Sequence, residues 1–220
     1  MEFKVIVTGA TGMVGEGVLL ECLDHQGIKE VLMVNRRHFN LQHPKLKELI
    51  VPDFNRLDEY SEHLEGYDAC FYCAGVSSVG MDEKTYSYIT LDITLFFANI
   101  LVKLNPDMIF NYVSGSQTDS SEKGRIMWAR VKGKTENALL KLPFRNVYCF
   151  RPGLIKPVLK QRNVKFLYKT TGILYGLFKL LIPAYICTMH EVGLAMINVV
   201  QKSYPKNRLE VADIKILTKK

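Results

Sequence analysis

A glycine-rich turn near the start of the chain places the tightest constraint on its fold. Residues 8–15 read Thr-Gly-Ala-Thr-Gly-Met-Val-Gly, between an apolar run at 3–7 and a segment that predicts a helix over about 12–25. In this context the first glycine permits a tight turn, the second lets a pyrophosphate approach backbone N–H groups, and the third lets the helix pack closely on the sheet. The positive end of the helix then faces the phosphates. The alternative is a glycine turn without a ligand. We expect a dinucleotide to contact Gly9, Thr11, Gly12, Met13, Val14 and Gly15.

Strand and helix patterns alternate along the rest of the chain. Short apolar runs at 31–35, 49–51, 69–73, 108–113 and 147–150 predict strands, and 85–104 and 125–142 predict helices. This alternation predicts an α/β, Rossmann-like, doubly wound parallel sheet covered on both faces. The length of 220 residues suits one such domain. We therefore expect a single domain over 1–220, with a core at about 1–155 and a small C-terminal lobe at about 156–220 on the substrate side.

The C-terminal third has a different pattern. Residues 164–187 are rich in aromatic residues, leucine and lysine, but Lys179 and Pro183 interrupt the apolar part too early for a membrane span. This segment is expected either to cap a substrate site or to touch a membrane peripherally. Thr188-Met-His-Glu191 is a capping-box pattern that predicts a helix to about residue 202, and 210–217 predicts a final strand.

Charge and cysteine content limit the partners and the compartment. The net charge is +7, but no nucleic-acid recognition motif accompanies it, so a nucleic-acid partner is not expected. The five cysteines are scattered, which suggests a reducing compartment and a cytoplasmic location. Cys70 and Cys73 have the spacing of a redox or metal motif. They lie in a buried-strand pattern with no second Cys/His pair nearby, so no metal site is predicted.

The end of the second predicted strand favours one form of the dinucleotide. An acidic residue there would accept a hydrogen bond from the ribose 2′-hydroxyl, but the chain has Asn35-Arg36-Arg37. Two guanidinium groups suit a 2′-phosphate, which predicts NADP(H) rather than NAD(H). The alternative is a pair of exposed surface arginines.

Several further motifs occur in the order typical of a known superfamily. They are Asp53-Phe54 after the third strand, Cys73-Ala74-Gly75, Tyr112-Val113-Ser114-Gly115-Ser116, Val131-Lys132-Gly133-Lys134-Thr135-Glu136, and Arg151-Pro152-Gly153. Together with the glycine turn they cover about 3–155. The chain resembles the extended or atypical short-chain dehydrogenase/reductases, which include the NAD-dependent epimerase/dehydratase-like proteins. Among these it is most similar to the Tat-interacting oxidoreductase-like proteins, which share the Val-Lys-Gly-x-x-Glu and Phe-Arg-Pro-Gly stretches.

The resemblance implies roles for residues outside the glycine turn. Asp53 and Phe54 would contact adenine, Cys73, Ala74 and Gly75 would line the cofactor, and Pro152 and Gly153 would follow the sixth strand beside it. Ser116, with Ser114 as second choice, would orient the substrate oxygen. Lys132 would hold the nicotinamide ribose and lower the pKa of a catalytic tyrosine. The alternatives are that the serine is only a turn residue and that the lysine is only an exposed helix residue.

One position departs from the pattern that the resemblance implies. The catalytic tyrosine should lie four residues before Lys132, and the chain has Trp128 there. An indole N–H only donates a hydrogen bond and does not ionise in the working pH range. Three hypotheses follow. Another group supplies the proton, with Ser116, Lys132 or bound water as candidates; or the protein is a non-catalytic nucleotide-bound sensor, scaffold or regulator; or the chemistry differs from the usual hydride transfer. The leading expectation is oxidoreductase or epimerase/dehydratase chemistry on a small carbonyl or sugar-like substrate.

Overall fold

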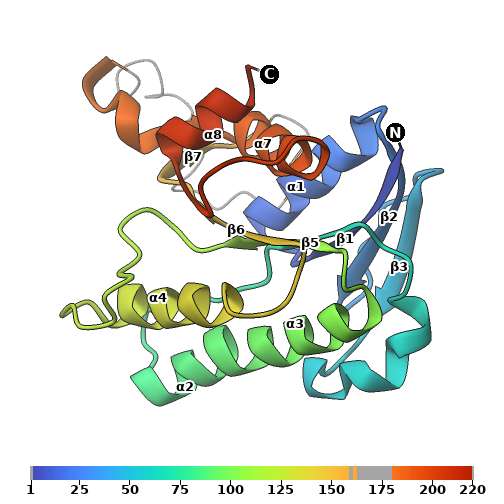
Figure 1. Ribbon diagram of the computed structural model, residues 1–220, viewed down its shortest axis with the longest axis horizontal. Helices are drawn as coiled ribbons and strands as arrows, with labels where there is room; N and C mark the ends of the chain where they lie inside the picture. Colours follow the sequence, from blue (N-terminus) through green and yellow to red (C-terminus); the bar gives the residue numbers. More distant parts are fainter. Residues whose placement is uncertain (1, 159–160, 163–179, 220) are drawn as a thin grey trace.

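A computed structural model describes residues 2–158, 161–162 and 180–219 and contains a seven-stranded sheet (Figure 1). The strand order is β3-β2-β1-β4-β5-β6-β9, and every neighbouring pair is parallel. The strands are β1 (Phe3–Thr8), β2 (Ile28–Asn35), β3 (Leu46–Ile50), β4 (Ala69–Tyr72), β5 (Ile109–Val113), β6 (Asn146–Arg151) and β9 (Arg208–Glu210). The order reverses between β1 and β4, as in doubly wound dinucleotide-binding folds. The predicted Rossmann-like fold class is confirmed.

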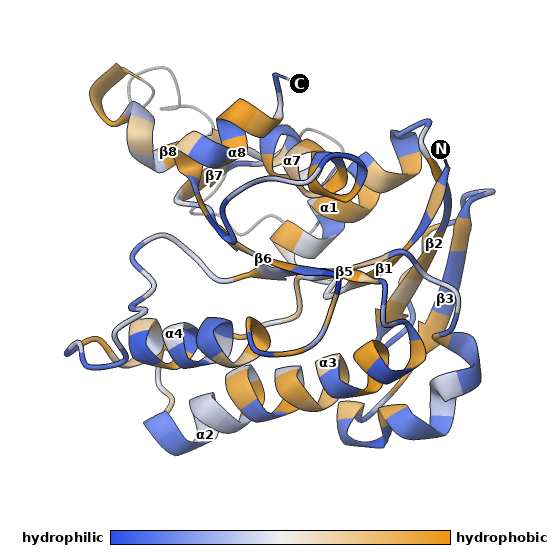
Figure 2. Ribbon diagram, in the orientation of Figure 1, coloured by the Kyte–Doolittle hydropathy of each residue, from blue (hydrophilic) through white to orange (hydrophobic). Residues whose placement is uncertain are grey.

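Helices cover both faces of this sheet (Figure 1). One layer contains α1 (Met13–Asp24), α7 (Met189–Gln201) and α8 (Val211–Leu217). The other contains α2 (Glu83–Ser87), the π-helical turn η2 (Tyr88–Asp92), α3 (Ile93–Leu104) and α4 (Met127–Leu139), with the 3-10 helix η1 (Phe54–His63) beside them. Apolar residues of α1, α7 and α8 belong to the core on one face, and those of α3 and η1 to the core on the other, whereas α2 is hydrophilic (Figure 2).

The central strands are buried on both faces. In β1, Val5 and Val7 belong to the core under α1 and α7, whereas Ile6 belongs to the core on the opposite face. Successive side chains of a strand point to opposite faces, so both positions must be apolar when both faces are covered. This is why the strands read as continuous apolar runs in the sequence.

The C-terminal third contributes partly to the main sheet and its helix layer, and partly to a small second sheet near the carboxyl ends of the strands. Helix α7 packs against α1, and β9 extends the main sheet beside β6. Near the carboxyl ends of the strands, β7 (Leu154–Lys156) pairs in parallel with β8 (Ile186–Thr188), which follows the short 3-10 helix η3 (Pro183–Tyr185). The capping box at Thr188 and Glu191 is present, as predicted.

Two predicted strands need correction. The expected strand at 49–51 lies earlier, as β3. The expected final strand at 210–217 is instead the short β9 followed by α8, because Val211, Ile214 and Leu217 recur every three residues and are all buried on one helix face. A capping box between Glu210 and Asp213 starts this helix.

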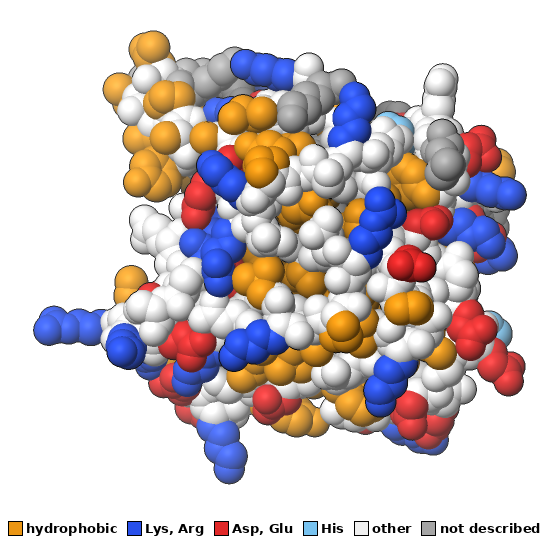
Figure 3. Space-filling view, viewed as in Figure 1, with side chains coloured by type: hydrophobic (Ala, Val, Ile, Leu, Met, Phe, Trp, Pro, Cys, Tyr) orange, Lys and Arg blue, Asp and Glu red, His pale blue; other side chains and the backbone are white. Residues whose placement is uncertain are grey.

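Two segments bear on membrane contact. Among the described residues, one helix, Glu83–Leu104, is long and apolar enough to cross a membrane by length and composition alone. It lies as a layer against the sheet, and its residues Phe97, Ala98 and Leu101 are fully buried. Most of the 164–187 segment lies outside the described residues. The described part before η3 exposes Leu180 and Leu181 by 80% and 65%. Hydrophobic side chains gather at the corner where this segment lies (upper left of Figure 1 and Figure 3).

Candidate functional site

Two adjoining cavities lie at the carboxyl ends of β1 and β4. Their volumes are about 1000 and 770 Å³. Both are lined by Thr11, Gly12, Cys73, Ala74 and Gly75. The two cavities therefore form one cleft across the switch point of the sheet, where doubly wound folds bind ligands.

The three glycines of the first turn meet different surroundings. Gly9 has φ +72°, and a Cβ there would lie 2.7 Å from the backbone of Ala74. A Cβ on Gly15 would lie 2.2 Å from the carbonyl oxygen of Gly9. At Gly12 the nearest atom to a Cβ is the Gly9 oxygen at an ordinary 3.4 Å, and the residue lines both cavities. Packing thus requires Gly9 and Gly15, whereas the open side of Gly12 leaves room for a ligand.

The N-terminus of α1 and the end of β4 form the floor of this cleft. Helix α1 starts after Gly12 without a side-chain cap, so its first N–H groups are available to an anion. The hydroxyl of Thr8 accepts hydrogen bonds from the N–H groups of Cys73 at 3.2 Å and Ala74 at 3.1 Å. These bonds tie the ends of β1 and β4 together. Burial raises the pKa of the Cys73 thiol to about 12, and the described residues contain no cluster that could hold a metal ion.

Cationic, amide and aromatic side chains line the smaller cavity. Arg36 and Arg37 are exposed at its edge, and Phe54 forms part of its wall. Asn35 is only 3% exposed, and its Nδ2 has no hydrogen-bond partner in the described part of the chain. A buried amide donor without a partner is costly, so this atom fits a ligand acceptor. Asp53 does not line either cavity; its carboxylate accepts the N–H of Asn55 and caps η1.

The larger cavity brings together the residues expected to do chemistry. Ser114, Ser116, Trp128 and Lys132 line it, together with Met13, Val14, Gly15, Pro152 and Gly153. Apart from Asp53, every residue that the sequence analysis assigned to the site therefore lines one or both parts of the cleft.

The two candidate serines differ in what holds their hydroxyls. The hydroxyl of Ser114 donates to Glu136 Oε1 at 2.5 Å, and the residue is 8% exposed. Ser116 is half-buried, and its N–H donates to the carbonyl of Pro152 at 2.9 Å. Its hydroxyl has no hydrogen-bond partner among the described residues. Ser116 is thus the serine whose hydroxyl is free to contact a ligand.

Lys132 is fixed at the end of β5. Its Nζ donates to the carbonyl oxygens of Ser114 at 2.6 Å and Val113 at 3.3 Å, and it lies 5.8 Å from the centre of the Tyr112 ring. Burial lowers the pKa of the Lys132 ammonium to about 8. Trp128 is half-buried and lies one helical turn before Lys132, on the same side of α4.

A close backbone contact sets the distance between the serine loop and α4. A Cβ on Gly133 would lie 1.8 Å from the carbonyl oxygen of Asp119, whose N–H donates to Ala129 at 3.0 Å. The loop after β5 therefore lies directly on α4. Gln117, next to Ser116, has φ +66°, a backbone conformation that is uncommon for a residue other than glycine.

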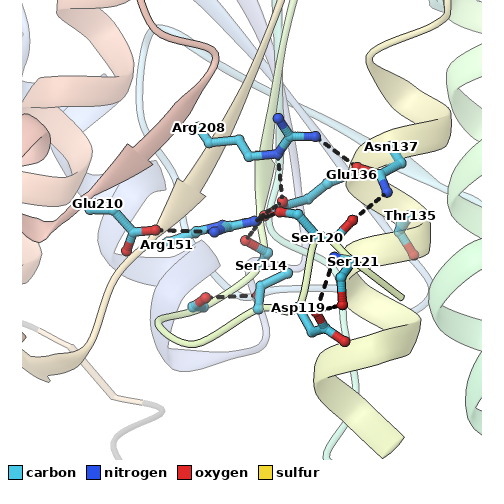
Figure 4. A network of polar contacts seen from close by, with 12 residues as sticks. Ser114, Asp119, Ser120, Ser121, Thr135, Glu136, Asn137, Arg151, Arg208 and Glu210 are labelled. Atoms are coloured by element: carbon cyan, nitrogen blue, oxygen red, sulfur yellow. Dashed lines mark hydrogen bonds and ion pairs between the residues drawn. The ribbon is translucent and has the colours of Figure 1, made fainter. Parts of the chain in front are cut away.

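A buried ionic network lies behind the serine loop (Figure 4). Glu136 is fully buried and pairs with Arg151, whose Nε donates to Glu136 Oε1 at 2.9 Å. The same guanidinium donates to Ser120 Oγ at 2.6 Å and to Glu210 Oε1 at 3.1 Å, while Arg208 lies 3.4 Å from Glu136. The network joins α4, β6 and β9 to the loop that carries Ser116. Sequence reasoning noted Glu136 and Arg151 only as motif letters and gave them no role.

Arg162 and Tyr185 also line the larger cavity and lie C-terminal to the predicted motifs that line it. The N–H of Arg162 donates to Glu16 Oε1 at 2.8 Å, and its guanidinium donates to the carbonyl of Asn40 at 3.1 Å. Tyr185, at the end of η3, lines the larger cavity from the C-terminal third. No local motif marks either residue, because chain segments distant in sequence bring them to the cleft.

Comparisons with known proteins agree with this architecture. Protein HTATIP2 of Rattus norvegicus is 28% identical over 154 residues, which are 69% of this chain and 62% of that protein. The chain thus matches about three fifths of the length of that relative. The mitochondrial protein FMP52-2 of Scheffersomyces stipitis is 23% identical over 96% of this chain and 92% of its own.

Solved structures share the fold at low sequence identity. The ADP-L-glycero-D-manno-heptose-6-epimerase of Helicobacter pylori is 15% identical, with a TM-score of 0.66 over 92% of this chain and 73% of its own. The enzyme WbmF of Bordetella bronchiseptica, solved in complex with NAD+, is 15% identical, with a TM-score of 0.66 over 98% of this chain and 77% of its own.

The family comparison covers the half of the chain that builds the cofactor end of the cleft. The model of the NAD dependent epimerase/dehydratase family matches residues 5–116, from the glycine turn to Ser116. The resemblance to the short-chain dehydrogenase/reductase superfamily is confirmed, and the chain has an NAD(P)-binding, oxidoreductase-like fold. This protein belongs to the NAD dependent epimerase/dehydratase family.

Proposed function

We propose that this protein is an NADP(H)-dependent oxidoreductase that acts on a small carbonyl or sugar-like substrate. The observation that carries the proposal is the convergence of the free Ser116 hydroxyl and the Lys132 ammonium on the cavity that also contains the N-terminus of α1. A hydroxyl and a fixed cation beside a phosphate-binding turn suit stabilisation of a developing oxyanion next to a bound dinucleotide.

The chain offers a matching group for each part of the cofactor. The N–H groups that follow Gly12 suit the pyrophosphate, and Asn35 suits the adenosine ribose or its phosphate. Arg36 and Arg37 suit the 2′-phosphate that distinguishes NADP(H) from NAD(H), and no carboxylate among the described residues of the smaller cavity would repel it. The bound cofactor supplies or accepts a hydride.

Side chains of the protein carry out the remaining steps. The Ser116 hydroxyl donates a hydrogen bond to the substrate oxygen, and Lys132 holds the nicotinamide ribose while adding positive charge. Trp128 forms a flat apolar wall that excludes water from the reacting atoms. Ser114 has a supporting role, because its hydroxyl is bound to Glu136.

One observation favours a second candidate function. Trp128 occupies the position at which the superfamily resemblance implies the proton-donating tyrosine, and an indole cannot replace a phenol as an acid. A dinucleotide-bound regulator without turnover is therefore the alternative. We also propose a cytoplasmic location and peripheral membrane contact through 164–187. Both are compatible with either function.

Turnover with a substrate panel separates the two functions. We expect purified protein to oxidise NADPH in the presence of at least one aldehyde, ketone or keto sugar, and Ser116→Ala to lower kcat by about 100-fold. Ser121→Ala, in the same loop but outside the cavity lining, is the matched control and should leave kcat unchanged. Tight NADPH binding with no turnover on any member of the panel would establish the regulator instead.

A further inference from the structure

Tyr185 lines the larger cavity and comes from the C-terminal third of the chain. It ends η3 and precedes β8, whose residue Ile186 pairs with Leu154 of β7. This register places Tyr185 beside Gly153, where a Cβ would lie only 2.1 Å from the Tyr185 carbonyl oxygen. The close approach fixes the backbone of Tyr185 against the loop that follows β6.

The same loop also holds Ser116. The N–H of Ser116 donates to the carbonyl of Pro152 at 2.9 Å, one residue before the contact between Gly153 and Tyr185. Ser116 and Tyr185 are thus anchored to adjacent residues of one loop, and both line the larger cavity with Trp128 and Lys132. Tyr185 is 51% exposed, and its hydroxyl makes no hydrogen bond to the described residues.

Carbonyl reduction needs a proton at the oxygen, and few groups in this cavity can give one. Trp128 does not ionise in the working range, and a serine hydroxyl is a poor acid. The Lys132 ammonium is bound to two carbonyl oxygens of the main chain. A phenol is a proton donor of the kind that such reactions use, and Tyr185 is the tyrosine among the described residues that line the cavity.

We infer that Tyr185 supplies the acid that Trp128 cannot supply, so that the proton donor has moved from α4 to the C-terminal third. The inference rests on the proposed oxidoreductase function. Bound NADPH would supply the hydride that the carbonyl carbon accepts, and the nicotinamide would thereby be oxidised to NADP+. The O–H bond of Tyr185 breaks, its proton bonds to the carbonyl oxygen to complete the alcohol, and water returns a proton to the phenolate.

A footprint tests the location of Tyr185 without turnover. Tetranitromethane nitrates accessible tyrosines, and mass spectrometry follows each site. Tyr88 is the internal control, because it is 48% exposed and lines neither cavity. Saturating NADP+ should slow nitration of Tyr185 at least about threefold and leave Tyr88 unchanged, as expected for a group within van der Waals reach of the bound cofactor. Equal nitration of Tyr185 with and without NADP+ would overturn the inference.

Kinetics test the acid role. On the carbonyl that the wild-type protein reduces fastest, Tyr185→Phe should lower kcat by about 100-fold or more with KM little changed, and Tyr88→Phe should have no effect. The kinetic isotope effect with deuterated NADPH should rise, because hydride transfer becomes rate-limiting. Wild-type turnover that survives Tyr185→Phe would refute the acid role and leave the proposed function intact. A wild-type protein inert on the whole panel would remove the proposed function, and the acid role with it.

Discussion

The two ends of the cleft are built by different means. At the end proposed to hold adenosine and pyrophosphate, the cleft is built from contiguous residues and backbone geometry: a turn, a helix N-terminus and the end of β2. At the chemistry end, side chains from β5, α4, the loop after β6 and η3 meet around one cavity, backed by the Glu136–Arg151 network. A short motif suffices to specify the first end, whereas the second depends on the packing of distant segments.

The largest expected effect is on the network behind the chemistry end. Glu136→Gln leaves the Arg151 guanidinium without its buried partner, which should lower the free energy of unfolding by about 3–5 kcal/mol in urea titrations. The control is Glu83→Gln, which breaks an exposed pair with Arg130 and should cost less than about 1 kcal/mol. Equal costs for the two substitutions would show that the network does not support this end of the cleft.

At the backbone-built end, Gly12→Val should separate binding from folding. A side chain at Gly12 enters the space left for the pyrophosphate but clashes with little of the protein. Calorimetry should show affinity for NADPH lowered at least about 100-fold, equivalent to about 2.7 kcal/mol, with an unchanged melting temperature. In contrast, Gly15→Val should impair folding itself, because its Cβ would meet the Gly9 backbone at 2.2 Å. Unaltered NADPH affinity in Gly12→Val would place the cofactor elsewhere.

The arginine pair sharpens the description of the adenosine end. Replacing Arg36 and Arg37 together with alanine should remove most of a preference for NADPH over NADH, a change of about 10- to 100-fold for one or two charge-assisted hydrogen bonds. Affinity for NADH should stay nearly constant. The double variant Arg56→Ala/Arg125→Ala removes the same charge away from the cleft and controls for general electrostatics. Equal NADPH and NADH affinities in the wild-type protein would contradict the NADP(H) assignment.

Moving the phenol from position 185 to position 128 tests which position at the chemistry end can supply the proton. In the Tyr185→Phe background, Trp128→Tyr should raise kcat by about tenfold or more, because it places a phenol one turn from Lys132. Trp128→Phe in the same background opens the same space without a proton. Equal gains in the two variants would mean that the indole acts by filling space alone.

The smallest expected effect is a pH dependence from Lys132. Its ammonium has a pKa lowered by burial to about 8, so NADPH affinity should fall as pH rises through about 8 and the positive charge is lost. Because the folded pKa lies below the ordinary value of 10.5, the unfolded chain binds more protons between these values, and the cost of burying this charge diminishes as pH rises across that window. Lys132→Met should remove both dependences, and Lys134→Met should remove neither. A pH profile that survives Lys132→Met would assign it to another group.

The contrast between the two ends also explains what the sequence could predict. The glycine turn, Asn35-Arg36-Arg37 and Cys73-Ala74-Gly75 lie at strand ends that periodicity locates well, and all of them line the cleft. The sequence could not rank Ser116 above Ser114 on physical grounds, because the hydroxyl of Ser114 donates its hydrogen bond to Glu136, 22 residues away. The sequence could not predict Tyr185 as a site residue for the same reason, since only the pairing of β7 with β8 brings it to the loop after β6.

The central claim is that a dinucleotide lies across the switch point with its nicotinamide in the larger cavity. Trp128 is the chain's one tryptophan and lines that cavity, and tryptophan emission overlaps the absorption of a reduced nicotinamide. Titration of the wild-type protein with NADPH should quench Trp128 and produce sensitised nicotinamide emission that saturates. NADH should need a higher concentration to reach the same signal. A titration in which NADPH neither quenches Trp128 nor binds by calorimetry would contradict the account.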